Sequence, residues 1–144
     1  MKLIRSLPVF LLVTVTTAVA APDQAVDPST LKDKVTIEVG KSIAVRFEQQ
    51  GNTLTRPKIV EKAADQPTTL SLDFRKQDDM LILVTKNPFP KDLKFRALAR
   101  LKGRKSYFET SIVPVKAGLL SFELWQDPIE ELILFDFTLI DNQP

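Results

Sequence analysis

Residues 91–113, KDLKFRALARLKGRKSYFETSIV, determine the fold class of this 144-residue chain. Apolar residues recur at every second position, which is the period of a β-strand with one face covered by a core. The stretch therefore predicts a strand and not a helix. The inner face carries Leu93, Phe95, Ala97, Ala99 and Leu101, and the outer face carries Lys94, Arg96, Leu98, Arg100 and Lys102.

Gly103-Arg104 predicts a two-residue turn into a second strand over residues 105–113. The apolar faces of the two strands agree across this turn, so the stretch predicts an antiparallel hairpin. The expected pairs are Phe95–Ile112 and Ala99–Phe108 on the inner face and Arg100–Tyr107 on the outer face.

A second hairpin is predicted around the loop at residues 127–130. Its expected inner pairs are Leu124–Ile133, Phe122–Phe135 and Leu120–Phe137. Trp125 and Leu132 would then face outward, with Leu134 beside them opposite Glu123. Such an apolar stripe is a candidate contact surface for a partner protein or a second copy of the chain. Two alternatives remain: the stripe packs under a loop or the N-terminal lead, or a one-residue slip exchanges inside and outside.

Other period-two runs lie between turn signals along the rest of residues 35–144, and no helical period is present. Pro57 interrupts one of these runs and predicts an edge strand over residues 53–60. About eight short strands predict a single all-β domain, an antiparallel immunoglobulin-like β-sandwich. The corner at residues 114–118, PVKAG, resembles that of many bacterial immunoglobulin-like domains, a likeness of architecture that implies no activity.

The first 20 residues have the layout of a secretory signal peptide. Lys2 and Arg5 precede an apolar run over residues 7–15, and Ala18-Val19-Ala20 supplies small residues for cleavage before Ala21. The apolar run is too short for a stable membrane anchor. We therefore expect a mature protein that is periplasmic or secreted and does not span the membrane. Residues 21–34 lack periodicity and predict a flexible N-terminal lead.

The composition removes several classes of chemistry. The chain has no histidine and no cysteine, so serine and cysteine nucleophiles that depend on imidazole are excluded, as are disulfides and the usual zinc, haem and iron–sulfur sites. We expect no cofactor and no metal. Beyond residue 20 the 18 acidic side chains are balanced by 18 basic ones, which argues against nucleic acid as a partner.

A basic face on the strand over residues 91–102 is a candidate anion-binding site. Its cationic side chains are Lys94, Arg96, Arg100, Lys102 and Arg104. A period of two concentrates most of them on one side, where they could hold an acidic glycan or a lipid head group such as that of lipopolysaccharide. The alternative is a solvated face that keeps the strand from pairing with other chains.

The loop Asn87-Pro88-Phe89-Pro90 places an aromatic side chain between two prolines. Phe89 is a candidate recognition residue at the tip of a rigid loop. The alternative is that this side chain folds back and caps the open end of the sandwich.

These observations predict a non-catalytic, exported binding or accessory module that contacts another envelope protein. The first alternative is the anion-binding module. The second is a carboxylate-based hydrolase, for which Asp78-Asp79 and Glu130-Glu131 are the adjacent pairs. Neighbouring residues on a strand point apart, however, and paired catalytic carboxylates come from different elements.

Overall fold

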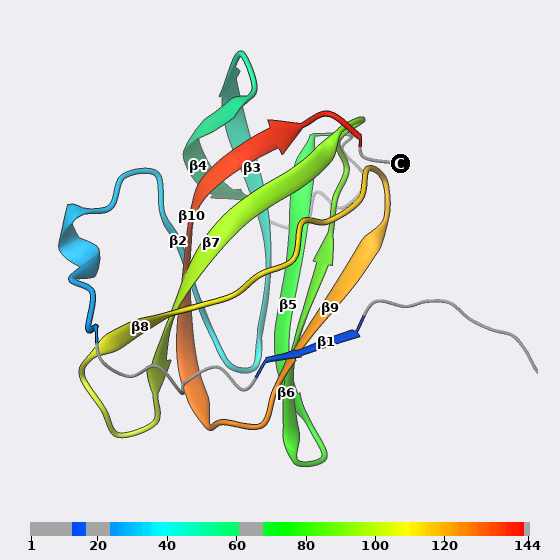
Figure 1. Ribbon diagram of the computed structural model, residues 1–144. Coiled ribbons are helices and arrows are strands. Elements are labelled where there is room, and N and C mark those ends of the chain that lie inside the picture. The colour runs from blue at the N-terminus through cyan, green and yellow to red at the C-terminus, as the bar shows by residue number, and fades with distance from the viewer. Residues whose placement is uncertain (1–12, 17–23, 61–67, 143–144) are drawn as a thin grey trace, which may run out of the picture.

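The computed structural model describes residues 13–16, 24–60 and 68–142, and it is all-β (Figure 1). In chain order the elements are β1 (Val13–Thr16), the 3-10 turn η2 (Pro28–Thr30), β2 (Val35–Glu38), β3 (Lys41–Gln50), β4 (Thr53–Val60), β5 (Thr69–Gln77), β6 (Met80–Lys86), β7 (Asp92–Leu101), β8 (Tyr107–Thr110), β9 (Leu120–Trp125) and β10 (Ile129–Ile140). Within the described residues no helix has the length and apolar character needed to cross a membrane.

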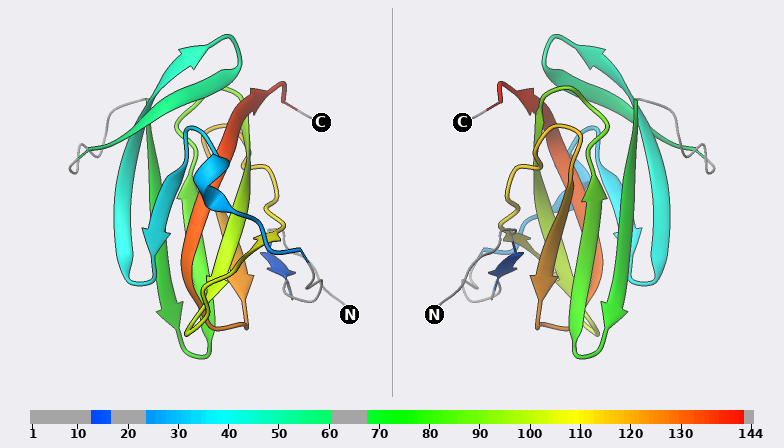
Figure 2. Two further views of the ribbon diagram at one scale, coloured as in Figure 1. Left: turned by 90° about the vertical axis from the view of Figure 1, so that its left-hand side faces the viewer. Right: turned by 90° about the vertical axis from the view of Figure 1, so that its right-hand side faces the viewer.

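The strands form one curled sheet in the order β1-β9-β6-β5-β3-β4-β10-β7-β8, with β2 also beside β10. Every pairing is antiparallel except that of β1 with β9. The sheet turns its corner where β4 meets β10 through the single pair Thr53–Thr138. Figure 2 shows the result, with β3, β5 and β6 on one side of the molecule and β10 and β7 on the other.

A second crossing between the two sides occurs at Gly40, between β2 and β3. Its φ of 91° is a conformation that glycine adopts readily and that residues with a Cβ atom disfavour. The Gly40 N–H donates to the carbonyl of Phe74 at 2.7 Å, which fixes the turn on β5. The chain can therefore leave β10 and join β5 within one tight turn.

The main core lies between the two sides of the curled sheet and is rich in aromatic rings. Phe95 and Phe137 stack with centroids 5.3 Å apart, and Phe47 contacts Phe137 at 4.8 Å. On the other side Phe74 meets Trp125 edge-on at 6.1 Å. Of these contacts, Phe47–Phe137 joins β3 to β10 and so links the two sides, whereas each of the other two packs strands of one side.

The first predicted hairpin is confirmed in β7 and β8. Ala99 pairs with Phe108 and Arg100 with Tyr107, as the two-residue turn requires. The pair Phe95–Ile112 does not form, because β8 ends at Thr110.

The second predicted hairpin is wrong, because β9 and β10 do not pair with each other. β9 pairs with β6, and β10 pairs with β7, β2 and β4. The faces are also exchanged: Trp125, Leu132 and Leu134 are buried, whereas Leu120 and Phe122 are 54% and 40% exposed. β10 carries buried apolar residues on both faces, so its period could not decide which face is inner, and in β9 the more apolar face is the outer one.

A β-bulge in β10 explains why its two halves differ. The register shifts between Phe135 and Thr138, and Asp136 adopts a left-handed φ of 57°. Before the bulge, Ile133 and Phe135 point to the outer face; after it, Phe137 points into the main core. Ile133 and Phe135, which were predicted to lie on the inner face opposite β9, therefore lie on the outer face.

The outer face of β7 and β10 has a small core of its own, made by Leu98, Ile133 and Phe135. Val26 and Leu31, from the predicted N-terminal lead, pack against it, and η2 lies over β10 in Figure 2. The Val26 N–H donates to the carbonyl of Tyr107 at 2.8 Å. Residues 24–34 thus cover this face and extend the edge at β8.

Truncation of leucines on the two faces tests this assignment. We expect Leu134→Ala to lower the free energy of unfolding by about 2–5 kcal/mol, because it opens a cavity in the core. Leu120→Ala, at an exposed position, should change it by less than about 0.5 kcal/mol. Urea unfolding of both variants measures this difference. If Leu120→Ala were the more destabilising of the two, the result would support the faces that the sequence predicted for this hairpin.

Candidate protein-binding surface

Trp125, Leu132 and Leu134, the predicted contact stripe, are fully enclosed by the core. The indole Nε1 of Trp125 donates to the hydroxyl of Thr110 at 3.0 Å, so even its polar atom is used internally. The prediction that these side chains form an outward surface is wrong, because the inner and outer faces of these strand segments are the reverse of those predicted.

Phe89 is also buried, at the end of the main core. The buried side chain of Asn87 holds this loop inward: its Nδ2 donates to the carbonyls of Lys91 and Val115, each at 2.9 Å, and its Oδ1 accepts from Phe89 N at 2.8 Å. Phe89 therefore folds back onto the core, as the alternative interpretation of this loop predicted. The structural role of Asn87, which holds the loop inward, was not predicted from the sequence.

Two of the three arginines of the basic face, Arg96 and Arg100, lie in ion pairs. Arg96 contacts both carboxylate oxygens of Glu109, at 2.8 and 2.7 Å, and Asp136 at 3.1 Å. These bonds, led by the one to Glu109, raise the pKa of the Arg96 guanidinium. Arg100 contacts Glu130 at 2.7 Å. Acidic residues of β8 and β10 thus neutralise part of the charge that the sequence concentrates here.

The rest of the basic face keeps its charge available to solvent. Lys94, Lys102 and Arg104 are exposed, and within the described part of the chain they form no ion pair. The predicted site is therefore split into two neutralised arginines and three exposed cations.

A different surface emerges on the opposite side of the molecule, where β9 presents large apolar side chains to solvent. Leu119, Leu120 and Phe122 are 57%, 54% and 40% exposed. Phe122 pairs with half-buried Val84 of β6, and paired residues of an antiparallel ladder share a face. Leu120 and Phe122 share the outer face of β9 and Leu119 directly precedes the strand, so this exposed apolar group is a candidate interaction surface.

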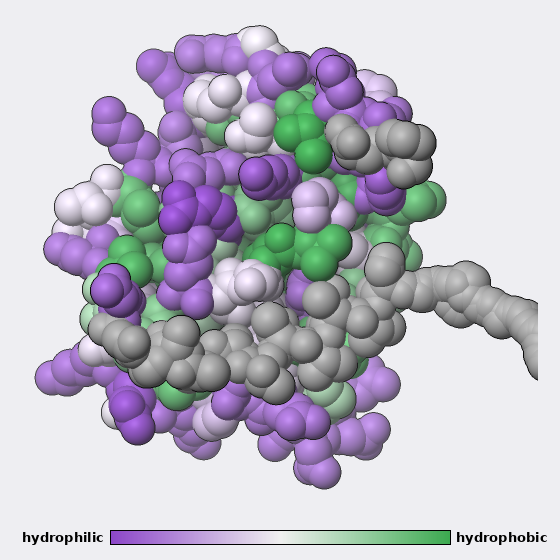
Figure 3. Space-filling view, in the orientation of Figure 1, coloured by the Kyte–Doolittle hydropathy of each residue, from purple (hydrophilic) through white to green (hydrophobic). Residues whose placement is uncertain are grey.

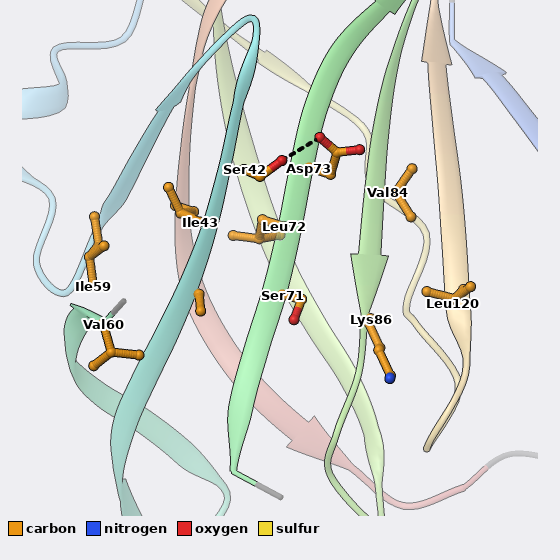
Figure 4. A pocket seen from close by; sticks show the side chains of 11 residues that line it. Ser42, Ile43, Ile59, Val60, Ser71, Leu72, Asp73, Val84, Lys86 and Leu120 are labelled. Carbon is orange, nitrogen blue, oxygen red and sulfur yellow. Dashed lines mark hydrogen bonds between the residues drawn. The ribbon is translucent and has the colours of Figure 1, made fainter. Parts of the chain in front are cut away.

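This apolar surface continues into a groove of about 700 Å³ across the outer face of β3, β5 and β6. Figure 4 shows its two walls, with Ile59 and Val60 on one side and Val84 and Leu120 on the other. The floor includes polar groups, among them a hydrogen bond of 2.8 Å from the Ser42 hydroxyl to Asp73. The groove therefore offers apolar walls with polar groups between them, as ligand and peptide grooves do.

Figure 3 shows part of the same surface from the side. Hydrophobic residues are visible at several places, one of them the right-hand margin near the beginning of β9, and hydrophilic residues cover most of the top and bottom of this view.

Behind this surface, on the inner face of β9, lies a buried carboxyl group. Glu123 is 1% exposed, and burial raises its pKa from 4.5 to about 7. Its Oε2 accepts a hydrogen bond from Val113 N at 2.8 Å, which offsets part of that shift. Its Oε1 and the nearby hydroxyls of Thr85 and Ser121 have no hydrogen-bond partner among the described residues.

Comparison of this chain with known protein families, with curated proteins and with solved structures gave no match.

Burial of Glu123 makes the stability of the protein depend on pH. Its folded-state pKa lies above the ordinary value, so the folded protein binds more protons than the unfolded chain between about pH 4.5 and pH 7. Stability therefore falls as the pH rises through this window. We expect the wild type to lose roughly 3 kcal/mol relative to Glu123→Gln, at 1.36 kcal/mol for each pKa unit.

Urea unfolding of both proteins at pH 5 and pH 8 measures this difference. Glu38→Gln, at an exposed position of β2, is the matched control. If the difference between wild type and Glu123→Gln stays constant from pH 5 to pH 8, the carboxyl group is not perturbed as described.

Proposed function

We propose that this chain is an exported, non-catalytic module that binds another envelope protein through the apolar surface of β9 and the adjoining groove. In this proposal residues 1–20 are a signal peptide, the mature protein is periplasmic or secreted, and the curled sheet is an immunoglobulin-like sandwich. The observation that carries the proposal is the exposure of Leu119, Leu120 and Phe122 on one edge of the sheet.

The energetics of β9 support this proposal. Its outward residues are leucine and phenylalanine, whereas its inward residues include Ser121 and a buried carboxyl group. Burial of one leucine or phenylalanine side chain contributes about 1.5–3 kcal/mol. The isolated chain does not gain this free energy in full for Leu120 and Phe122, because both remain exposed. A partner that covers Leu120 and Phe122 would recover it.

The charge distribution supports a protein partner over an acidic polymer. Arg96 and Arg100 already contact carboxylates of the same chain. An anionic glycan would have to displace Glu109, Asp136 and Glu130 before it could use them. The apolar surface needs no such exchange.

Site-specific photocrosslinking in the producing cell tests the proposal. With p-benzoylphenylalanine at position 120 or 122, we expect a discrete protein adduct, because these side chains are exposed and apolar. Lys94, which is exposed on the other side of the sheet, is the matched control and should give no such adduct. Detection is by immunoblot and mass spectrometry of the tagged protein.

Two results would contradict the proposal. In the first, adducts form equally from positions 94 and 122, which indicates nonspecific contact. In the second, crosslinks arise only from Lys102 and Arg104 and disappear at moderate salt, which would move the function to the exposed cations of the basic face.

A further inference from the structure

The outer edge of β9 is where the sheet is least protected from further pairing. Of its six residues only Glu123 is charged, and that side chain points into the core. The strand carries neither proline nor lysine, the usual residues that keep an edge from pairing.

Other edges of the sheet have features that hinder pairing. β4 carries Pro57 between Arg56 and Lys58, and Arg56 has a left-handed φ of 49°. β8 is four residues long and already accepts a hydrogen bond from Val26. Apart from its pairing with β1, the outer edge of β9 has no such features among the described residues.

The backbone of β9 shows which groups face this edge. Asn87 N donates to the carbonyl of Leu119 at 3.0 Å, so residue 119 directs its backbone toward β6. Because an antiparallel ladder alternates, residues 121 and 123 also direct their N–H and C=O groups to β6. The N–H and C=O groups of Leu120, Phe122 and Leu124 therefore face the outer edge.

One segment of the chain pairs with this edge in the structure. β1 lies parallel to β9 in the register Val13–Phe122, Thr14–Glu123, Val15–Leu124 and Thr16–Trp125 (Figure 1). Its sequence, VTVT, is short, β-branched and uncharged. β1 also lies inside residues 1–20, so cleavage before Ala21 would remove it and leave the edge open.

We propose that the outer edge of β9 is a strand-addition site for a partner protein. An extended partner segment with apolar or β-branched residues at alternate positions pairs parallel to Leu120–Trp125, in the place that β1 takes here. This inference rests on the proposed function and deepens it, since the backbone supplies affinity and the apolar surface selects the side chains.

The register of β1 indicates what the partner segment must contain. Val13 and Val15 are level with Phe122 and Leu124, whose side chains are on the outer face. In a strand, every second residue lies on the same face. A partner segment with valine, isoleucine or leucine at those alternate positions would extend the apolar surface by one strand.

A peptide that copies β1 tests the inference. The protein is produced from its complete coding sequence in an exporting host, and mass spectrometry reads its N-terminus. The probe is a fluorescein-labelled peptide of residues 11–18, LLVTVTTA, and its binding is followed by fluorescence anisotropy. The control peptide, LLVPVPTA, keeps the valines but cannot complete the backbone ladder.

Two variants at one position separate the edge from the apolar face. Phe122→Thr removes the ring and keeps the N–H group, while Phe122→Pro also removes the N–H group that faces the edge. We expect the probe to bind the wild type, to bind Phe122→Thr a few-fold more weakly, and to lose at least about tenfold more in Phe122→Pro. Thermal unfolding checks that both variants fold.

The outcomes separate this inference from the proposed function. Equal binding by the Thr and Pro variants, or binding of the proline peptide, overturns strand addition but leaves a side-chain surface that crosslinking still detects. If the exported protein retains residues 13–16 and does not bind the probe, the edge is occupied by its own chain and the inference is wrong. If no protein adduct forms from positions 120 and 122, the proposed function itself is contradicted.

Disulfide trapping tests the orientation, because the natural chain contains no cysteine. A probe with cysteine in place of Val13 should react with Phe122→Cys, and one with cysteine in place of Val15 should react with Leu124→Cys. Antiparallel addition would favour the exchanged combinations, and that result would overturn the parallel register. Disulfide-linked protein dimers without probe would indicate that a second copy occupies the edge.

Discussion

The pairing of β10 with β7 is the constraint on which the rest of the structure depends. β10 is the longest strand among the described residues, and it contacts β7 along most of its length while also pairing with β2 and β4. The bulge at Asp136 lets its first half enclose Leu132 and Leu134 and its second half enclose Phe137 in the same core. If these residues continued as a regular strand without the bulge, Phe137 would point outward with Phe135, and the stack with Phe95 would be lost.

The polar contacts around the bulge follow from this arrangement. Asp136 tolerates the left-handed backbone that the bulge needs, as aspartate does more readily than bulkier residues. Arg96 then bridges Asp136 to Glu109, and its guanidinium lies 4.9 Å from the Phe135 ring. The arginine that the sequence suggested as an anion site thus has a structural role, since it joins β8, β7 and β10.

The strand pattern predicted the all-β class, the β7–β8 register and most core residues of β7, because these segments have one apolar face and one polar face. It failed for β9 and β10, where Leu132, Ile133, Leu134 and Phe135 are all buried. A strand covered on both faces has no inner side that a period of two can identify. The pairing of β9 with β6 joins residues about 40 positions apart, and local turn signals carry no information about such a contact. The candidate surface was missed because the sequence pattern placed Leu120 and Phe122 on the inner face of β9, whereas both are exposed.

The two sides of the molecule differ in which part of the chain covers them, and this asymmetry is the strongest support for a partner. On β7 and β10 the outer apolar residues Leu98, Ile133 and Phe135 are covered by Val26 and Leu31, which lie beyond the predicted cleavage site and would stay with the proposed mature chain. On β9 the corresponding edge is covered by β1, which lies before that site. Processing would therefore leave the outer face of β7 and β10 covered and would expose the backbone edge of β9. If β1 is removed, the edge of β9 loses the strand that pairs with it here, and this supports the proposal that a segment of another protein takes that place.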